Sequence, residues 1–181
     1  MADEPTLLKI AQLGQPVLRR EAAEVPAERI GSPEFQRFLS AMFDTLRHEK
    51  GAGLAAPQVF VSLRVFIAAI EFPEGEDAPP VFETFINPEI EPIGAEIESA
   101  WEGCLSFAEL LVLVPRHRAV SVRYLNAQGE PSTLGLAGLP ARGVQHEFDH
   151  IEGIVTIDRA ESSLDIVKAS EIDAARAARG E

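Results

Sequence analysis

The clearest apolar pattern in the chain predicts an amphipathic helix in its first third. Apolar residues there recur at intervals of three and four and so fall on one helical face: Phe35, Phe38, Leu39, Met42, Phe43 and Leu46. Ser32 is suited to the N-cap, Pro33 to the first helical position, and Gly51 can end the helix. Two further helices are predicted, one roughly from Leu139 to Glu152 and one from Ser162 or Ser163 to about Arg179.

Between these helices the pattern changes to short segments that are β-branched or alternate between apolar and polar residues. Pro, Gly and Asn bound them, and they predict strands at 63–71, 82–87, 93–99, 118–126 and 131–137. Asn126–Gly129 predicts a hairpin turn between the last two. Because strands cluster in the middle with helices on either side, we expect an α+β fold and not a regular βαβ alternation. We find no internal repeat or dividing linker, so residues 1–181 are expected to form one domain.

Composition limits the classes of binding partner and the cellular compartment that we expect. The formal charge of −13 argues against binding to a phosphate backbone, which requires a basic face. The longest apolar stretches, such as Val65–Ile70, are too short to span a bilayer. The acidic opening Met1–Glu4 lacks the basic start and apolar core of a secretory signal, and a single cysteine, Cys104, cannot form an internal disulfide. We therefore expect a cytoplasmic protein with neither nucleic-acid nor membrane partners.

The segment His146–His150, with the sequence HEFDH, carries the most chemical information. Residues four apart on a helix share a face about 6 Å apart along the axis, so both imidazoles can reach one metal at bond lengths of roughly 2.0–2.1 Å. Glu147 then lies beside the metal without binding it, where a base acting on metal-bound water belongs. Two ordinary surface histidines are the alternative, and the predicted helical context favours the metal.

Two histidines leave such a site one protein ligand short, because a catalytic metal usually has three. No histidine follows His150, although several glutamates do: Glu152, Glu161 and Glu171. Upstream, Cys104 follows a glycine, and a thiolate is a strong ligand for iron or zinc. A free cysteine is also often a small buried core residue. Spacing alone leaves both interpretations of Cys104 open.

Three segments together resemble the three signature motifs of peptide deformylases, in the same order and at similar spacing: Gly51–Gln58 (GAGLAAPQ), Glu102–Ser106 (EGCLS) and Gln145–His150 (QHEFDH). Weaker likeness extends to Gly14–Arg19, Val114–Arg116 and Ile157–Arg159. The resemblance implies a fold of mixed or antiparallel sheets around a central helix that carries the HExxH motif. It also implies that Cys104, His146 and His150 bind one divalent metal, typically Fe²⁺ in the cell, with Zn²⁺, Ni²⁺ or Co²⁺ as substitutes.

The activity implied by this resemblance is removal of the formyl group from the N-terminal formyl-methionine of newly synthesised polypeptides, releasing formate. Metal-bound water would attack the formyl carbon, with Glu147 as general base and acid. Gln58 and the backbone N–H of Leu105 would donate hydrogen bonds to the developing oxyanion; the residues alone would favour Gln58 as a polar residue ending a glycine-rich turn. The family's substrate contacts match Gly51, Ala52, Gly53, Trp101, Leu139 and Gly143.

Some positions depart from the family pattern or suggest further roles. Phe60 stands where glycine is usual, Phe107–Ala108 replaces an aliphatic–proline pair, and Leu111 replaces a common arginine. These positions are expected to flank the peptide-binding groove and not the metal. Glu102 and Arg116 could form an ion pair that braces the strand carrying Cys104, and two solvated charges are the alternative.

Two other functions compete with deformylation. HExxH alone permits a zinc endopeptidase, but the missing downstream histidine and the presence of Cys104 count against it. A catalytically silent relative that binds peptide ends should have lost Glu147, Cys104 or the oxyanion donors, and none is missing. In some relatives the last helix docks on the ribosome, a partner that the mixed charge of this segment supports only weakly.

Overall fold

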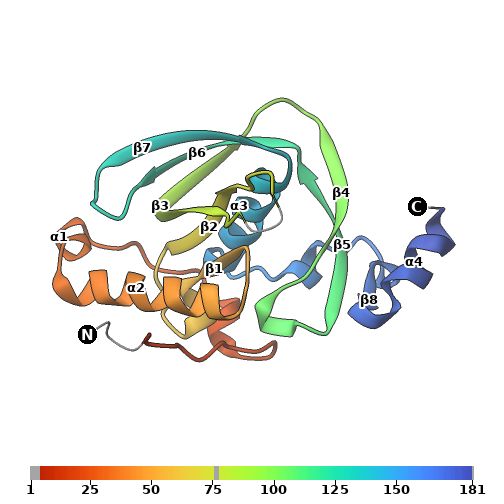
Figure 1. Ribbon diagram of the computed structural model, residues 1–181, viewed down its shortest axis with the longest axis horizontal. Coiled ribbons are helices and arrows are strands. Elements are labelled where there is room, and N and C mark those ends of the chain that lie inside the picture. The colour runs from red at the N-terminus through yellow and green to blue at the C-terminus, as the bar shows by residue number, and fades with distance from the viewer. Residues whose placement is uncertain (1–4, 76–77, 181) are drawn as a thin grey trace.

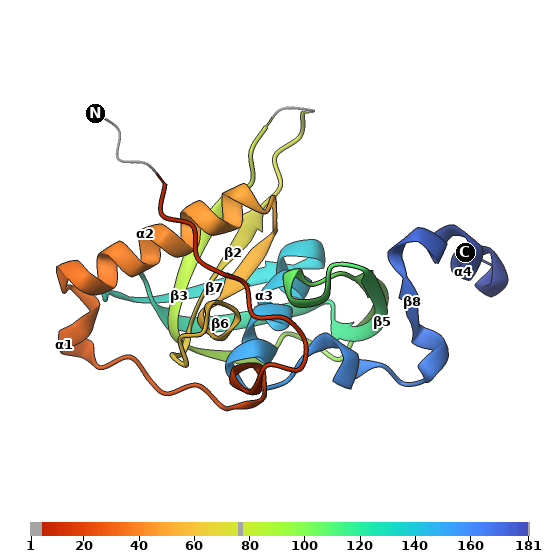
Figure 2. The ribbon, with the colours of Figure 1, turned by 90° about the horizontal axis from the view of Figure 1, so that it is seen from below.

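The computed structural model describes residues 5–75 and 78–180, which form two antiparallel sheets and four α-helices (Figures 1 and 2). The five-stranded sheet has the order β1 (Gly53–Ala55), β2 (Val65–Glu71), β3 (Val81–Pro92), β6 (Ala119–Leu125) and β7 (Pro131–Ala137). The three-stranded sheet has the order β4 (Ile97–Glu102), β5 (Leu110–His117) and β8 (Ile166–Lys168). The helices are α1 (Ala27–Ile30), α2 (Pro33–His48), α3 (Gly138–Ile151) and α4 (Ile172–Arg179).

The helix α3, which carries the HExxH segment, lies at the centre of the fold. It contacts strands of both sheets, and both views place it between α2 at one end of the molecule and α4 at the other (Figures 1 and 2). The α+β class, with an N-terminal amphipathic helix and a C-terminal helix around a central α3, is therefore confirmed.

Helix α2 forms as its sequence predicts. The Ser32 hydroxyl accepts a hydrogen bond from the backbone N–H of Phe35 at 3.2 Å, which caps the first turn. The apolar face of α2 is buried against the five-stranded sheet: Phe35, Leu39, Met42 and Leu46. The helix ends at His48, three residues before Gly51.

Strand β2 is apolar almost throughout because both of its faces are covered. Val65 and Ile67 belong to the core on the α2 side, whereas Phe66 and Ala68 belong to the core on the α3 side. Successive side chains of a strand point to opposite faces, so a strand between two helical layers must be apolar on both. This arrangement fixes α3, and with it the histidines, against the sheet.

The predicted hairpin turn is confirmed, and a second glycine turn follows α3. In the β6–β7 hairpin the N–H of Gly129 donates to the carbonyl of Asn126 at 2.9 Å, and Gly129 has a φ of +82°. Gly153 follows α3 with a φ of +73°, and a Cβ there would lie 2.9 Å from the carbonyl carbon of Arg20. Only glycine fits that position, so the chain leaves α3 close to the N-terminal segment.

The predicted helix from Ser162 or Ser163 to Arg179 is wrong in its first half. Residues 163–165 form a 3-10 turn, β8 follows, and only α4 is α-helical. Strand β8 pairs with β5, and that tertiary pairing overrides the local helical preference. Strands β1, β5 and β8 were not predicted, and the strand expected at 93–99 is divided between the turn after β3 and the start of β4.

Phe60 occupies a backbone conformation that favours glycine. It has a φ of +64° and a ψ of +18°, and its side chain is 44% exposed. A left-handed conformation costs a residue with a Cβ roughly 1–2 kcal/mol. We therefore predict that Phe60→Gly raises the free energy of unfolding by about 0.5–1 kcal/mol, because glycine's greater freedom in the unfolded chain offsets part of the gain. Urea unfolding measures this change, and a less stable Phe60→Gly protein would show that the exposed ring contributes packing.

Among the described residues, no helix combines the length and the apolar character that crossing a membrane requires. Residues 1–4, on which the expectation of no export signal was based, lie outside the described residues.

Candidate metal centre

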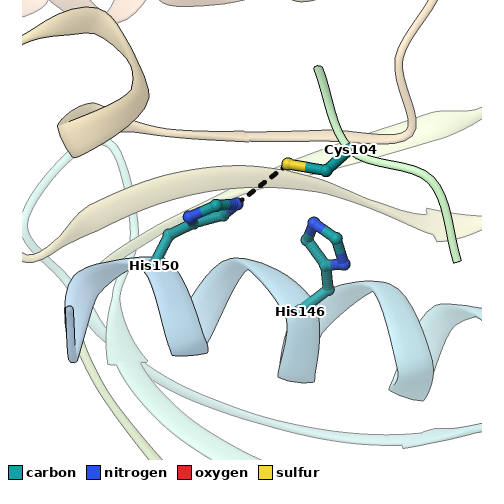
Figure 3. Close-up of side chains that lie close together, drawn as sticks. All are labelled: Cys104, His146 and His150. Atoms are coloured by element: carbon teal, nitrogen blue, oxygen red, sulfur yellow. Dashed lines mark hydrogen bonds between the residues drawn. The ribbon is translucent and has the colours of Figure 1, made fainter. Parts of the chain in front are cut away.

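The two histidines of α3 point the same way from the helix, as their spacing predicts (Figure 3). Their ring centroids are 5.2 Å apart. Both are buried, His146 at 8% exposed and His150 at 1%. Burial lowers the pKa of His150 well below its usual value. Burial also acts to lower the pKa of His146, but hydrogen bonds to Cys104 and Glu102 outweigh it and raise that pKa well above its usual value, so a metal ion would displace a proton from His146.

Cys104 approaches these histidines from the three-stranded sheet. It follows Gly103 at the end of β4 and begins a 3-10 turn, with its Sγ accepting from the N–H of Ser106 at 3.5 Å. The Sγ lies 3.3 Å from Nε2 of His150 (Figure 3). One ligand atom from each of Cys104, His146 and His150 lies within 4.8 Å of the other two. Ligands bound tetrahedrally at thiolate and imidazole bond lengths stand about 3.5 Å apart, so these side chains fit one metal ion.

Glu102 orients His146. Its Oε2 accepts from Nδ1 of His146 at 2.9 Å, which leaves Nε2 as the ring nitrogen available to a metal. Burial would raise the pKa of the Glu102 carboxyl, but hydrogen bonds from His146 and Arg116 outweigh it and lower the pKa to about 2. Glu102 is therefore ionised at neutral pH, and its charge makes the imidazole a stronger ligand.

The expected ion pair between Glu102 and Arg116 is confirmed. The guanidinium donates to both carboxylate oxygens, Nε to Oε1 at 2.7 Å and Nη2 to Oε2 at 2.9 Å. Both side chains are at most 5% exposed, so the alternative of two solvated charges is wrong. Burial alone would lower the pKa of Arg116, but Glu102 and Asp149 raise it above its usual value.

This pair belongs to a larger, mostly buried network that the sequence interpretation missed. Arg116 also donates to Asp149 at 2.8 Å, Arg142 donates to Glu102 at 2.7 Å, and Arg159 donates to both oxygens of Asp149. A signal was present in the sequence: Arg142 and Asp149 lie four residues before and three after His146, on the helix that packs between the sheets. The network ties α3 to both β4 and β5.

Glu147 is buried beside the ligand group and has an unusual pKa. It is 4% exposed, and burial raises its pKa from 4.5 to about 7. Its Oε2 has no hydrogen-bond partner among the described residues. A carboxyl group with a pKa near neutrality can both accept and donate a proton at physiological pH.

Gly53 provides the space that Glu147 occupies. A Cβ on Gly53 would lie 2.4 Å from Oε1 of Glu147, closer than such atoms can approach. We predict that Gly53→Ala displaces the carboxylate and lowers kcat/KM by about 10²-fold, since a shift of about 1 Å in a reacting group can cost that much.

A matched control for Gly53→Ala is Gly31→Ala. Gly31 has a φ of −77°, and a Cβ there meets nothing within 4 Å. Steady-state kinetics should show wild-type values for Gly31→Ala. Equal values for both variants would mean that Glu147 does not need its present position.

A cavity of about 380 Å³ opens beside the ligand group. Its lining includes the six expected substrate contacts, namely Gly51, Ala52, Gly53, Trp101, Leu139 and Gly143. Gln58, Leu105, Cys104, His146 and Glu147 also line it, so His150 is the only expected site residue outside this lining. Of the positions that depart from the family pattern, Ala108 lines the cavity but Phe60 and Leu111 do not. Phe107 is instead buried in the core that contains Leu18 and Val112.

The side-chain amide of Gln58 is fixed in orientation. Its Oε1 accepts from the N–H of Ala55 at 2.8 Å, so the amide nitrogen points the other way. That nitrogen lies 3.5 Å from Sγ of Cys104 and 3.3 Å from Oγ of Ser106. The Gln58 amide therefore donates toward the ligand group, to one ligand atom and to a hydroxyl beside it.

Comparisons with known proteins point to one family. A sequence model of the family described as polypeptide deformylase matches residues 7–165. The chain is 40% identical to peptide deformylase 2 of Nostoc sp. over 171 residues, 92% of this chain and 93% of that protein. It is similar to the Met-Ala-Ser-bound crystal structure of the class I type b peptide deformylase of Acinetobacter baumannii, with a TM-score of 0.79 and 38% identity over 86% of this chain and 99% of that one. It is also similar to the crystal structure of a peptide deformylase from Synechococcus elongatus in complex with actinonin, with a TM-score of 0.78 and 34% identity over 99% of this chain and 88% of that one.

Proposed function

This chain belongs to the polypeptide deformylase family, and we propose that it hydrolyses the N-terminal formyl-methionine of newly made polypeptides at the cavity between α3, β1 and β4. One observation carries this proposal: a thiol and two imidazoles meet beside a buried carboxyl group on a cavity wall. The Met-Ala-Ser peptide bound in the Acinetobacter structure supports a substrate that begins with methionine. Such substrates arise where polypeptides are made, so we place the reaction in the cytoplasm.

Cys104, His146 and His150 would hold one divalent metal ion. The set of one thiolate and two imidazoles suits iron or zinc, and we propose ferrous iron as the native ion. When bound, such a cation supplies Lewis acidity and lowers the pKa of a coordinated water toward about 7. Glu102 and the charged network behind it would keep His146 in the orientation that this ion requires.

Glu147 would move the proton that the reaction transfers. Hydrolysis of a formamide consumes one water and releases formate and a free amine, so a proton must pass from the water oxygen to the amine nitrogen. Glu147 faces the cavity. Its pKa of about 7 allows it to accept that proton and deliver it within one turnover.

Gln58 and Leu105 would stabilise the oxyanion that forms on the formyl oxygen. Both residues line the cavity, and Leu105 begins the turn after Cys104. Gln58 would donate from its side-chain amide and Leu105 from its backbone N–H. Because Ala55 holds the carbonyl end of the Gln58 side chain, the amide nitrogen already faces the ligand group before charge develops. Each donor of this kind contributes typically about 10²–10³ in rate.

The substrate backbone would lie along β1. β1 is an edge strand of the five-stranded sheet and pairs with β2 along one side, which leaves its other side open to a peptide. Gly51–Gly53 line the cavity at this strand. An extended peptide can pair with such an edge. Trp101, Leu139 and Gly143 would surround the methionine side chain, to which they offer apolar surface.

A formate-release assay on anaerobically purified protein, with metal analysis of the same sample, tests this function. We expect stoichiometric metal and formate release from a formyl-Met-Ala-Ser peptide. A casein digest run in parallel separates deformylation from the alternative of a zinc endopeptidase. Metal-loaded protein that releases no formate would refute the proposal.

A further inference from the structure

The C-terminal helix α4 reaches the wall of the substrate cavity through one side chain. The guanidinium carbon of Arg179 lies 5.5 Å from the centre of the Trp101 ring. Trp101 belongs to β4 and lines the cavity of the metal centre. The matched family stretch ends at residue 165, so Arg179 comes from a part of the chain beyond it. A residue outside the family match thus contacts a residue of the site.

Arg179 is held in this position by the segment that precedes β8. Its Nη2 donates to the carbonyl of Leu164 at 3.0 Å and to Oδ1 of Asp165 at 2.6 Å. Asp165 is buried, with 8% of its surface exposed. These bonds orient a planar cation toward the aromatic ring, and Arg179 is only 32% exposed at its side chain. The contact is therefore built from three partners and is not a chance approach of a surface arginine.

The three-stranded sheet supports both sides of the contact, because it contains Trp101 in β4 and also β8, the strand that leads to α4. β8 pairs with β5 through Val167 opposite Leu111, and β4 pairs with β5 through Trp101 opposite Leu113. In Figures 1 and 2, α4 lies beyond this sheet at the end of the molecule away from α2. The pairing of β8 with β5 holds the start of the C-terminal segment, and the bond from Arg179 to Asp165 holds its end. The position of α4 relative to Trp101 is therefore defined.

Trp101 lies where the substrate cavity adjoins a second cavity. A second cavity of about 160 Å³ shares three lining residues with the first: Trp101, Leu139 and Arg142. Arg142 is buried and bound to Glu102, and Leu139 is 60% exposed. The Trp101 ring is the largest of the three side chains that the two cavities share.

We propose that Arg179 is a positioning residue that holds the Trp101 ring as a wall of the cavity, so that α4 limits the size of the first side chain of the substrate. The proposal rests on the proposed function for its substrate, but the contact itself does not depend on it. A cation over an indole at a partly exposed site contributes about 2–5-fold in an equilibrium. Loss of the cation should change binding by a factor of this size while leaving the proton transfer by Glu147 unaffected.

The test uses full-length Arg179→Ala, with the emission of Trp101 as a direct report, since it is the chain's only tryptophan. We expect red-shifted emission and stronger acrylamide quenching. On formyl-Met-Ala-Ser, KM should rise about 2–5-fold with kcat unchanged, and the preference over formyl-Phe-Ala-Ser should shrink by a similar factor. Arg179→Lys, which keeps a cation, should restore part of each effect. The matched control is Lys168→Ala, which removes an exposed cation from β8.

The outcomes separate this proposal from the proposed function. An active wild type whose Arg179→Ala variant keeps wild-type emission, KM and preference would overturn the positioning role. So would a lower unfolding midpoint without any change in emission or preference, because the contact would then serve stability alone. A wild type that releases no formate would refute the function, whereas the change in Trp101 emission would still support the contact.

Discussion

Replacing Glu147 by glutamine is expected to leave the metal content unchanged and to lower kcat by about 10²–10⁴-fold. Glutamine has nearly the same shape and fits the space beside Gly53, but it cannot accept a proton. The ligands Cys104, His146 and His150 are untouched, so the metal should remain bound. Formate release and metal analysis on one preparation measure both quantities.

Glu161→Gln is the control for this substitution, because Glu161 is exposed and lies outside the cavity lining. It should retain wild-type turnover. Wild-type turnover in Glu147→Gln would assign the proton transfer to another group. Loss of metal from that variant would instead show that the carboxylate helps to hold the ion.

The same variant has an expected effect on the stability of the metal-free protein. Burial raises the pKa of Glu147 from 4.5 to about 7, so between these values the folded state binds a proton that the unfolded chain has released. Stability therefore falls as pH rises through this range, and the loss is complete above pH 7. Metal-free Glu147→Gln should be more stable than metal-free wild type above this range and should approach it at low pH. Urea unfolding across pH measures the difference.

Replacing Arg116 by alanine is expected to destabilise the protein by about 3–5 kcal/mol, because it leaves buried carboxylates without their cation. Glu102 would lose both of its bonds from Arg116, and Asp149 would lose one. Glu102 also accepts from His146, so we expect weaker metal binding, by about 10–100-fold. Urea unfolding and competition with a chelator measure the two effects.

Arg118→Ala is a matched control two residues along the chain. Arg118 pairs with Glu96 at 2.9 Å, but the two side chains are 57% and 66% exposed. An exposed pair of this kind contributes at most about 1 kcal/mol. If Arg116→Ala kept wild-type stability, metal content and turnover, the bracing role of the network would be wrong.

Local features of the chain could be predicted because their causes lie within a few residues. The Ser32 cap, the apolar face of α2 and the Asn126–Gly129 turn depend on neighbours in sequence, and all are present. The shared direction of His146 and His150 follows from helical geometry alone. The resemblance to a family then selected Cys104 and Gln58, which the residues by themselves did not distinguish from core and turn positions.

Contacts between distant segments could not be predicted in the same way. The approach of Cys104 to His150 spans 46 residues, and that of Arg179 to Trp101 depends on the pairing of β8 with β5. The sequence predicted one continuous helix from Ser162 or Ser163, yet part of that segment pairs with an edge of β5 as strand β8.

The sequence by itself determined which side chains could form a metal site and which helix would present two of them, because i and i+4 positions share a face in any helix. Only the tertiary structure decided that Glu102, Arg116 and Asp149 would be buried together and that α4 would reach Trp101. Burial and cross-sheet pairing depend on how the two sheets pack around α3, and no short stretch of sequence contains that information.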